Sequence, residues 1–318
     1  QVGVVPVRYE LALKCEPQEV ALLSEELGAA HDLKGVPAPD SPEALADLDG
    51  ERSERGEVEV CLLGPVDVAG GDLGALESSR RVAALAVLAF LAAHPRPVSA
   101  DELSSNLWPL DASRDDLGGP QRKTVMNVIS RARAIVGYGR GGRDRLVYSA
   151  MGYRLAEDVT SDWARFQRLV AAARAKSGHE ARSSLHQALE LVRGEPFSGA
   201  LSSQFFEWVA SEHLDLIMAA KVVDVAQELG EMALAAGDFD AVVWAVEKGL
   251  QLEPTREALF CLWMHALGRT GRPAKVDDVY RRLQRVLRQR LHPLQEPQAE
   301  TRAVWRLYTS AEVGITQG

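Results

Sequence analysis

Two short turn sequences that lie 34 residues apart constrain the fold of this chain more than any other feature. Ala236-Gly-Asp-Phe239 ends one helical pattern and begins the next, and Thr270-Gly-Arg-Pro273 does the same one period later. A period of this length is typical of tetratricopeptide-like helix pairs, in which each pair buries one face against its neighbour. Since two such pairs seldom form a stable core alone, we expect the preceding helices to complete it.

The sequence predicts helices from residue 158 to its end. The helices expected to complete the core cover 163–173, 181–192 and 205–229. A last helix at 299–309 is expected to cap the second pair, with Trp305 and Leu307 supplying the apolar surface. We expect the tryptophans of this region to pack in its core rather than to stack on a ligand, namely Trp208, Trp244, Trp263 and Trp305.

Residues 58–157 follow a different pattern. The alternation of Val58, Val60 and Leu62 with less apolar neighbours predicts a strand. Three helical patterns follow, at 79–94, 99–107 and 120–136, and two short strand patterns, at 145–148 and 153–155, then flank a turn. A small sheet, three helices and a terminal hairpin together predict a winged helix-turn-helix domain. We therefore expect a mostly α fold with a small β component, in which this domain precedes a tetratricopeptide-like all-helical domain.

Composition divides the chain into four parts. Residues 35–57 hold three prolines, seven acidic residues and no aromatic residue, a composition that predicts a linker. We expect residues 1–34 to be the tail of an upstream domain, 58–157 to be the winged-helix DNA-binding domain and 158–312 to be the helical domain.

The distribution of charge favours a nucleic-acid partner for the middle of the chain, although the formal net charge is −9. Residues 1–57 carry 13 acidic and 5 basic groups, whereas residues 121–154 carry 8 basic groups against Asp144 alone. Local clustering of this kind decides whether a surface attracts phosphate.

The helix expected at 120–136 has two different faces. Its apolar residues gather on one side, while the opposite side is polar, basic and small. Asn and Arg can form paired hydrogen bonds with adenine or guanine edges in the major groove, and arginines on either side can bind phosphates. The candidate DNA-binding residues are Arg122, Lys123, Thr124, Asn127, Ser130, Arg131, Arg133, Arg140, Arg143 and Arg145. An ordinary amphipathic surface helix with solvated charges is the alternative interpretation.

No motif in the sequence predicts an enzyme, a cofactor or a metal site. The seven histidines form no HExxH arrangement, and Gly139-Arg-Gly-Gly142 lacks the Lys-Ser/Thr pair of a phosphate-binding loop. The three cysteines are far apart, which favours a reducing, cytoplasmic location. The longest apolar run, 82–93, is too short to span a membrane, so we expect no membrane contact within this chain.

The sequence also resembles a known family. Val58 to Val68, Val98 to Pro109, Val128 to Arg133 and Gly152 to Leu155 resemble the OmpR-type winged helix of actinobacterial SARP-like regulators. The segments Ala188 to Phe197, Ala266 to Arg272 and Glu296 to Arg302 resemble the bacterial transcriptional activator domain (BTAD) that follows it. This resemblance implies a transcriptional regulator that binds duplex DNA. It also implies that the helical domain mediates self-association, or contact with RNA polymerase or another protein.

Two departures from the family pattern leave a second function open. Ala132 and Ala134 flank Arg133, and the turn at 149–152 carries no arginine. A loop with Asp111, Asp115 and Asp116 also lies close to the recognition helix. The alternative function is a protein-interaction or signalling module, in which a degenerate winged helix no longer binds DNA and the helical domain binds a peptide or a nucleotide effector.

Overall fold

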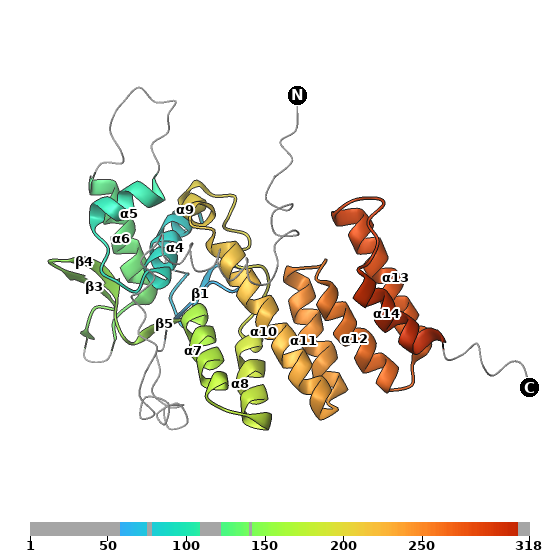
Figure 1. Ribbon diagram of the computed structural model, residues 1–318. Helices are drawn as coiled ribbons and strands as arrows, with labels where there is room; N and C mark the ends of the chain where they lie inside the picture. Colours follow the sequence, from blue (N-terminus) through green and yellow to red (C-terminus); the bar gives the residue numbers. More distant parts are fainter. Residues whose placement is uncertain (1–57, 75–77, 109–121, 140–141, 311–318) are drawn as a thin grey trace, which may run out of the picture. The chain divides into compact units, whose positions relative to one another are not determined.

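The computed structural model describes residues 58–74, 78–108, 122–139 and 142–310 (Figure 1). The expected upstream tail, the linker and the acidic loop at 111–116 lie outside the described residues. The first part of the fold contains β1 (Val58–Cys61), β2 (Asp67–Ala69), α4 (Ser78–Ala93), α5 (Ala100–Leu107), α6 (Arg122–Val136), β3 (Leu146–Ser149) and β4 (Gly152–Leu155). These elements form the winged helix-turn-helix that the sequence predicted.

The second part is almost entirely helical. It contains β5 (Val159–Ser161), α7 (Asp162–Arg174), α8 (Gly178–Glu190), η2 (Gln204–Phe206), α9 (Glu207–Ser211), α10 (Leu214–Ala236), α11 (Phe239–Leu252), α12 (Glu257–Arg269), α13 (Pro273–Arg290) and α14 (Ala299–Thr309). The two turns that are 34 residues apart join α10 to α11 and α12 to α13, as predicted. Gly237 and Gly271 occupy these turns with φ of 74° and 70°, a left-handed conformation that glycine adopts without steric cost.

Strand β5 contradicts the prediction that only helices follow residue 158. It pairs in parallel with β1, with Val58 opposite Val159, and completes a sheet in the order β2-β1-β5. A strand of three residues is too short to show a period-two pattern, and its pairing partner lies 101 residues earlier in the chain. Sequence periodicity therefore carries no signal for it.

The hairpin of β3 and β4, here called the wing, has the register that its turn imposes. Ser149 pairs with Gly152 at the turn, and Leu146 pairs with Leu155 at the open end. Val98, which precedes α5, forms a backbone bridge with Tyr153 through bonds of 2.7 and 2.8 Å. The wing is thus fixed to the segment that leads into α5.

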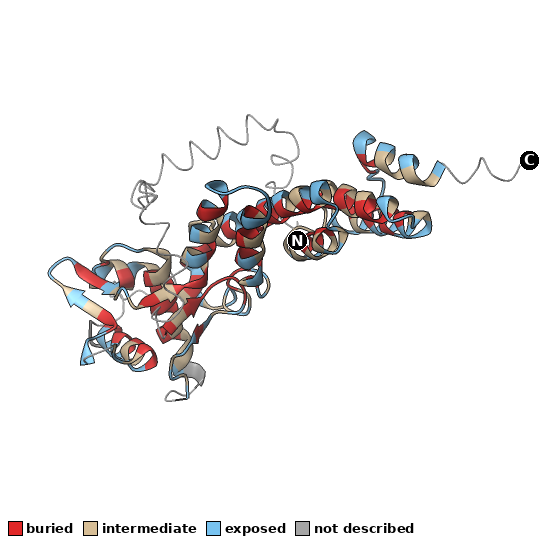
Figure 2. Cartoon of the chain, turned by 90° about the horizontal axis from the view of Figure 1, so that it is seen from below, coloured by how far each residue is buried: buried red, intermediate tan, exposed pale blue. Residues whose placement is uncertain are grey.

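A continuous hydrophobic core runs from β1 to Ala245 of α11, and a second cluster lies among α10 to α13. The first core joins the winged helix to the helical part. Trp208 of α9 is 2% exposed. Its ring and the Phe90 ring of α4 form an edge-to-face contact, with the centroids 4.9 Å apart. Figure 2 shows the buried positions on the inward sides of the helices, whereas the outer surface and the hairpin tip are exposed.

The helix expected at 205–229 is broken in the structure. A short 3-10 turn, α9 and α10 replace it, and His213 separates the last two with a φ of 56°. This left-handed residue redirects the chain so that Trp208 and Val209 enter the core, with exposures of 2% and 0%. The break depends on this packing, which local helix propensity does not report.

The C-terminal helix α14 packs on the second pair, but one of its expected contacts is wrong. The Trp305 ring stacks on the Tyr280 ring of α13 with the centroids 4.7 Å apart. The Nε1 of Trp305 donates a hydrogen bond to the carboxylate of Asp277 at 3.1 Å. Leu307, expected to supply apolar surface, is 63% exposed. Tyr308 instead packs against the second hydrophobic cluster, and its hydroxyl lies 2.9 Å from Nδ1 of His265 in α12.

Candidate nucleic-acid interface

Helix α6 has the two faces that the sequence predicted. Val125, Val128, Ile129 and Ala132 are at most 3% exposed and anchor the helix in the core. The side that carries Thr124, Asn127, Ser130 and Ala134 is exposed to solvent. A helix anchored along one face and small and polar along the other has the division that entry into a DNA groove requires.

Two of the expected arginines lie where a nucleic acid can reach them. Arg131 is half-buried at the flank of α6, and Arg143 is exposed in the segment before β3. The carbonyl of Arg143 accepts a hydrogen bond from the amide of Gly139 at 2.8 Å, which closes the loop between α6 and the wing. The Arg143 side chain thus projects from a loop with defined backbone bonds.

Arg145 is the clearest correction to the expected site. It is only 6% exposed, its Nε donates to Asp158 at 2.9 Å, and its Nη1 donates to the carbonyl of Val136 at 3.1 Å. This arginine joins the end of α6 to the segment before β5. Because its charge is already paired inside the protein, we leave Arg145 out of the proposed phosphate-binding surface.

Arg133 also has a partner within the fold. Its Nε donates to the carbonyl of Leu146 in β3 at 3.3 Å, and the residue is half-buried. Arg133 therefore holds the wing against α6 as well as adding charge there. Arg140 and the side chains of Arg122 and Lys123 lie outside the described residues.

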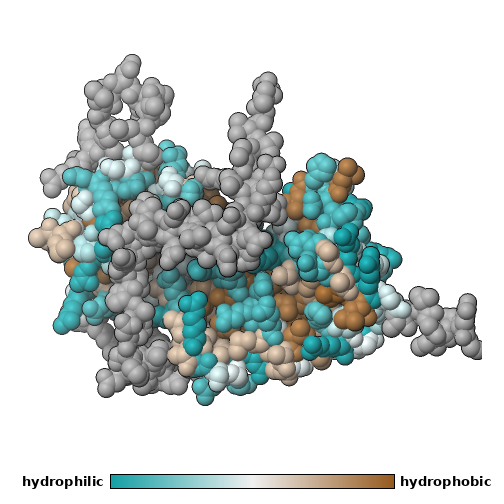
Figure 3. All heavy atoms as spheres, viewed as in Figure 1, coloured by the Kyte–Doolittle hydropathy of each residue, from teal (hydrophilic) through white to brown (hydrophobic). Residues whose placement is uncertain are grey.

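Three exposed side chains near α6 were not among the expected site residues. Met126 of α6 is 40% exposed, and Tyr148 and Met151 of the wing are 62% and 75% exposed. Figure 3 shows a hydrophobic patch at the outer tip of the wing, at the left of the view. Their apolar character distinguishes these side chains from the basic and amide groups that the sequence pointed to.

Asp162, the first residue of α7, connects the helical part to the winged helix-turn-helix. Its carboxylate accepts hydrogen bonds from the amides of Leu62 and Leu63 at 2.7 and 3.0 Å, and Arg193 lies 3.5 Å away. Burial raises the pKa of this carboxyl group, while the two amides and Arg193 oppose that shift. These hydrogen bonds hold the residues that follow β1 against the first turn of α7.

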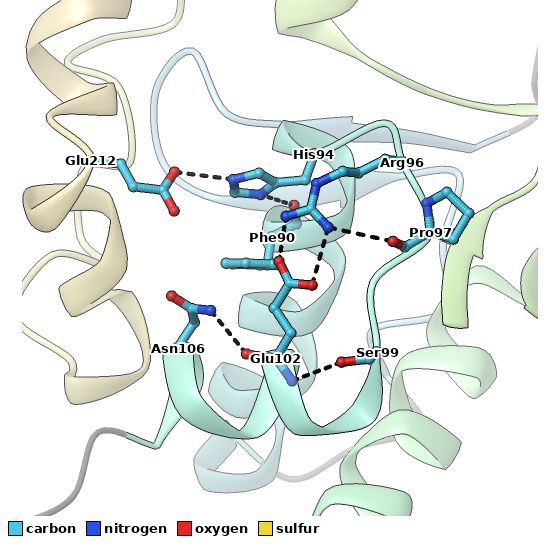
Figure 4. Close-up of polar contacts among 8 residues, drawn as sticks. All are labelled: Phe90, His94, Arg96, Pro97, Ser99, Glu102, Asn106 and Glu212. Atoms are coloured by element: carbon cyan, nitrogen blue, oxygen red, sulfur yellow. Dashed lines mark hydrogen bonds and ion pairs between the residues drawn. The ribbon is translucent and has the colours of Figure 1, made fainter. Parts of the chain in front are cut away.

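A second tie joins α4 to the end of α9 (Figure 4). His94 lies between the carbonyl of Phe90, 2.8 Å from Nδ1, and the carboxylate of Glu212, 3.0 Å from Nε2. Both partners are acceptors, so both contacts are hydrogen bonds only when the imidazole carries two protons. Burial lowers the pKa of His94, but the hydrogen bond and charge of Glu212 outweigh it and leave the pKa raised.

Comparison with known proteins agrees with this arrangement. Residues 161–306 match the family model of the bacterial transcriptional activator domain, and we call them the BTAD segment. EmbR of Mycobacterium tuberculosis, solved in complex with a low-affinity phosphopeptide, is similar in structure with a TM-score of 0.55 and 25% sequence identity. The match covers 80% of this chain and 65% of that chain, so this protein spans less than two thirds of EmbR. No curated protein sequence matches the chain.

Two further observations hold for the residues that the structure describes. Among them, no helix is both long enough and apolar enough to cross a membrane. The same residues contain no group of three or more His, Cys, Asp or Glu side chains arranged to hold a metal ion.

Proposed function

We propose that this chain is a DNA-binding transcriptional regulator. In this proposal α6 enters the major groove, the wing lies over the backbone or the minor groove, and the BTAD segment serves self-association or contact with RNA polymerase or another protein. The observation that carries the proposal is the division of α6 into a buried face and an exposed polar face within a winged helix. The BTAD segment that follows supports it.

The proposal assigns different tasks to the exposed side chains. Asn127 and Arg131 face outward from the groove-entering helix, where amide and guanidinium groups can form paired bonds with base edges. Thr124 and Ser130 are short enough to let the helix approach the bases. Arg143, on the adjoining loop, is placed to bind a phosphate and to fix the register of the complex.

We also propose the division into a winged-helix domain, 58–157, and a helical domain, 158–312, preceded by a tail and a linker. With this boundary, β5 belongs by sequence to the second domain but completes the sheet of the first. We infer that the two domains work as one unit on DNA in the cytoplasm.

The assignment is tested by measuring the affinity of full-length variants for a duplex selected from a random pool and for unrelated duplexes. Asn127→Ala and Arg131→Ala should each lose about 1–3 kcal/mol of binding free energy on the selected duplex and little on the others. Arg143→Ala should weaken all duplexes alike. Arg285→Ala, which removes an exposed arginine from α13, is the charge-matched control and should change nothing. Equal losses on all sequences for every α6 variant would mean that the helix binds phosphates only.

The alternative of an interaction module has one observation in its favour. A groove of about 660 Å³ lies between α11 and α13, and Trp244 and Trp263 line it together with charged side chains. Both tryptophans are half-buried, so they do not pack as deeply as we expected. Absence of DNA binding by the full-length chain would favour this groove as the functional site.

A further inference from the structure

A row of side chains, Met126, Tyr153 and Tyr148, connects α6 with the wing. Met126 leaves α6 beside Asn127, and Tyr148 and Met151 are exposed on the wing. Large apolar side chains cannot bind phosphate. Where they are exposed on a surface otherwise suited to phosphate, they indicate an apolar contact with the partner. This row therefore has a different partner from the basic residues around it.

Tyr153 fixes the position of Met126. The Tyr153 side chain is 3% exposed, and its hydroxyl lies 3.3 Å from Sδ of Met126. The ring of Tyr153 also packs against the ring of Tyr148, with the ring centroids 4.8 Å apart. A methionine side chain loses rotamer freedom when it is ordered at an interface, and a contact that orders it beforehand reduces that loss.

The chemistry of Met126 restricts what it can recognise. A thioether has no donor and is only a weak acceptor, and in this protein the sulfur already lies against the Tyr153 hydroxyl. In the major groove the base edges present hydrogen-bonding groups, with one apolar exception, the C5-methyl group of thymine. The exposed part of Met126 can therefore gain more from contact with the thymine methyl group than from contact with any other base edge.

We propose that Met126 is a specificity-determining residue that contacts the C5-methyl group of a thymine in the bound duplex. Met126 and Asn127 lie about 100° apart around the helix, so they address different bases. The preferred site then contains a thymine close to the base bound by Asn127. Tyr153 is a positioning residue, which acts by holding Met126 in place. This inference rests on the proposed function.

The test removes one methyl group at a time from the DNA. Each thymine of the duplex selected by the wild-type protein from a random pool is replaced in turn by deoxyuridine, which leaves the phosphates and the base pairing unchanged. Binding of the full-length chain is measured by fluorescence anisotropy. At one position the replacement should weaken binding about three- to fivefold, the value expected for one methyl group taken out of water.

Three variants separate this contact from a general loss of affinity. Met126→Ala should bind the thymine and uracil duplexes equally, whereas Met126→Leu, which keeps an apolar group of similar volume, should retain a preference for thymine. Tyr153→Phe keeps the buried ring but removes the hydroxyl, and it should reduce the thymine-to-uracil ratio while leaving the salt dependence of binding unchanged.

The outcomes distinguish this proposal from the proposed function. Salt-dependent DNA binding with no effect of uracil at any position, an undiminished thymine-to-uracil ratio in Met126→Ala, or a selected duplex without thymine would overturn the role of Met126 and leave the regulator proposal standing. Absence of salt-dependent binding to any duplex would overturn both.

Discussion

Gly152 holds the wing at a point where a side chain does not fit. Its φ is 124°, and a Cβ atom there would lie 2.3 Å from the carbonyl oxygen of Val98. We expect Gly152→Ala to lower the free energy of unfolding by about 1–3 kcal/mol from backbone strain alone, and by more once the bridge between Val98 and Tyr153 is lost.

Urea unfolding of the full-length protein measures this loss. Gly137→Ala is the matched control, because Gly137 also has a positive φ, 64°, but has open space where its Cβ would be. Gly137→Ala should lower the free energy of unfolding by only about 1 kcal/mol. Equal losses in the two variants would show that the approach of Val98 to Gly152 is not what fixes the wing.

At the scale of elements, the C-terminal helix offers a direct comparison of two neighbouring apolar residues. Trp305 stacks on Tyr280 and donates to Asp277, whereas Leu307 is 63% exposed. We expect Trp305→Ala to lower the free energy of unfolding by about 2–4 kcal/mol, somewhat less than for a fully buried tryptophan, and Leu307→Ala to change it by less than about 0.5 kcal/mol. Thermal unfolding followed by circular dichroism tests this, and a larger effect at Leu307 would contradict the assigned packing of α14.

The contact between α4 and α9 should make stability depend on pH. The pKa of His94 in the folded protein is raised above its ordinary value of 6.5 by Glu212, in spite of burial and of the opposing charge of Arg96. A raised pKa of a basic group stabilises the fold fully below the unfolded value, and this stabilisation is lost as pH rises through the folded value. Arg96 itself pairs with Glu102, whose pKa is lowered by that bond, so this neighbouring pair stays charged throughout the range.

We therefore expect the free energy of unfolding to fall as pH increases from about 6.5 upward. Glu212→Gln removes the charge that raises the pKa of His94 but keeps a hydrogen-bonding side chain of the same size. In this variant the decline should be smaller. Urea unfolding at a series of pH values tests this, and the same slope in both proteins would mean that His94 does not contribute to it.

Most helices of this fold could be predicted from sequence because they carry their own apolar period, whereas the break between α9 and α10 depends on packing. The two faces of α6 and the turns at Gly237 and Gly271 depend on residues a few positions apart, and the structure agrees with them. The parts that could not be predicted depend on contacts between distant residues. Strand β5 is defined by its pairing with β1, and Arg145 is buried because Asp158 and Val136 meet it there.

The same distinction applies to the candidate interface. Exposed polar residues such as Asn127 follow from the helical period, whereas the role inferred for Met126 requires knowing that Tyr153 of the wing lies beside it. The cluster of basic residues at 121–154 is visible in the sequence, whereas the internal partners of Arg133 and Arg145 depend on the fold.

For the molecule as a whole, we propose that the exposed face of α6 and its surroundings bind duplex DNA. Residues 121–154 hold seven basic groups besides Arg145, and four of them lie on described parts of the structure: Arg131 and Arg133 on α6, Arg143 before β3 and Arg154 on β4. We expect about four to six of the seven to neutralise phosphates. Counterion release then makes the affinity fall steeply as salt is added. The BTAD segment, by contrast, should contribute little to this dependence.

The most direct test is the affinity of the full-length chain for duplex DNA measured over a series of salt concentrations. We expect a slope of roughly −3.5 to −5.5 in a plot of log affinity against log salt, and Arg143→Ala should make the slope shallower by about one. Arg285→Ala should leave the slope unchanged. A flat salt response, or no binding at low salt, would contradict DNA binding by this surface.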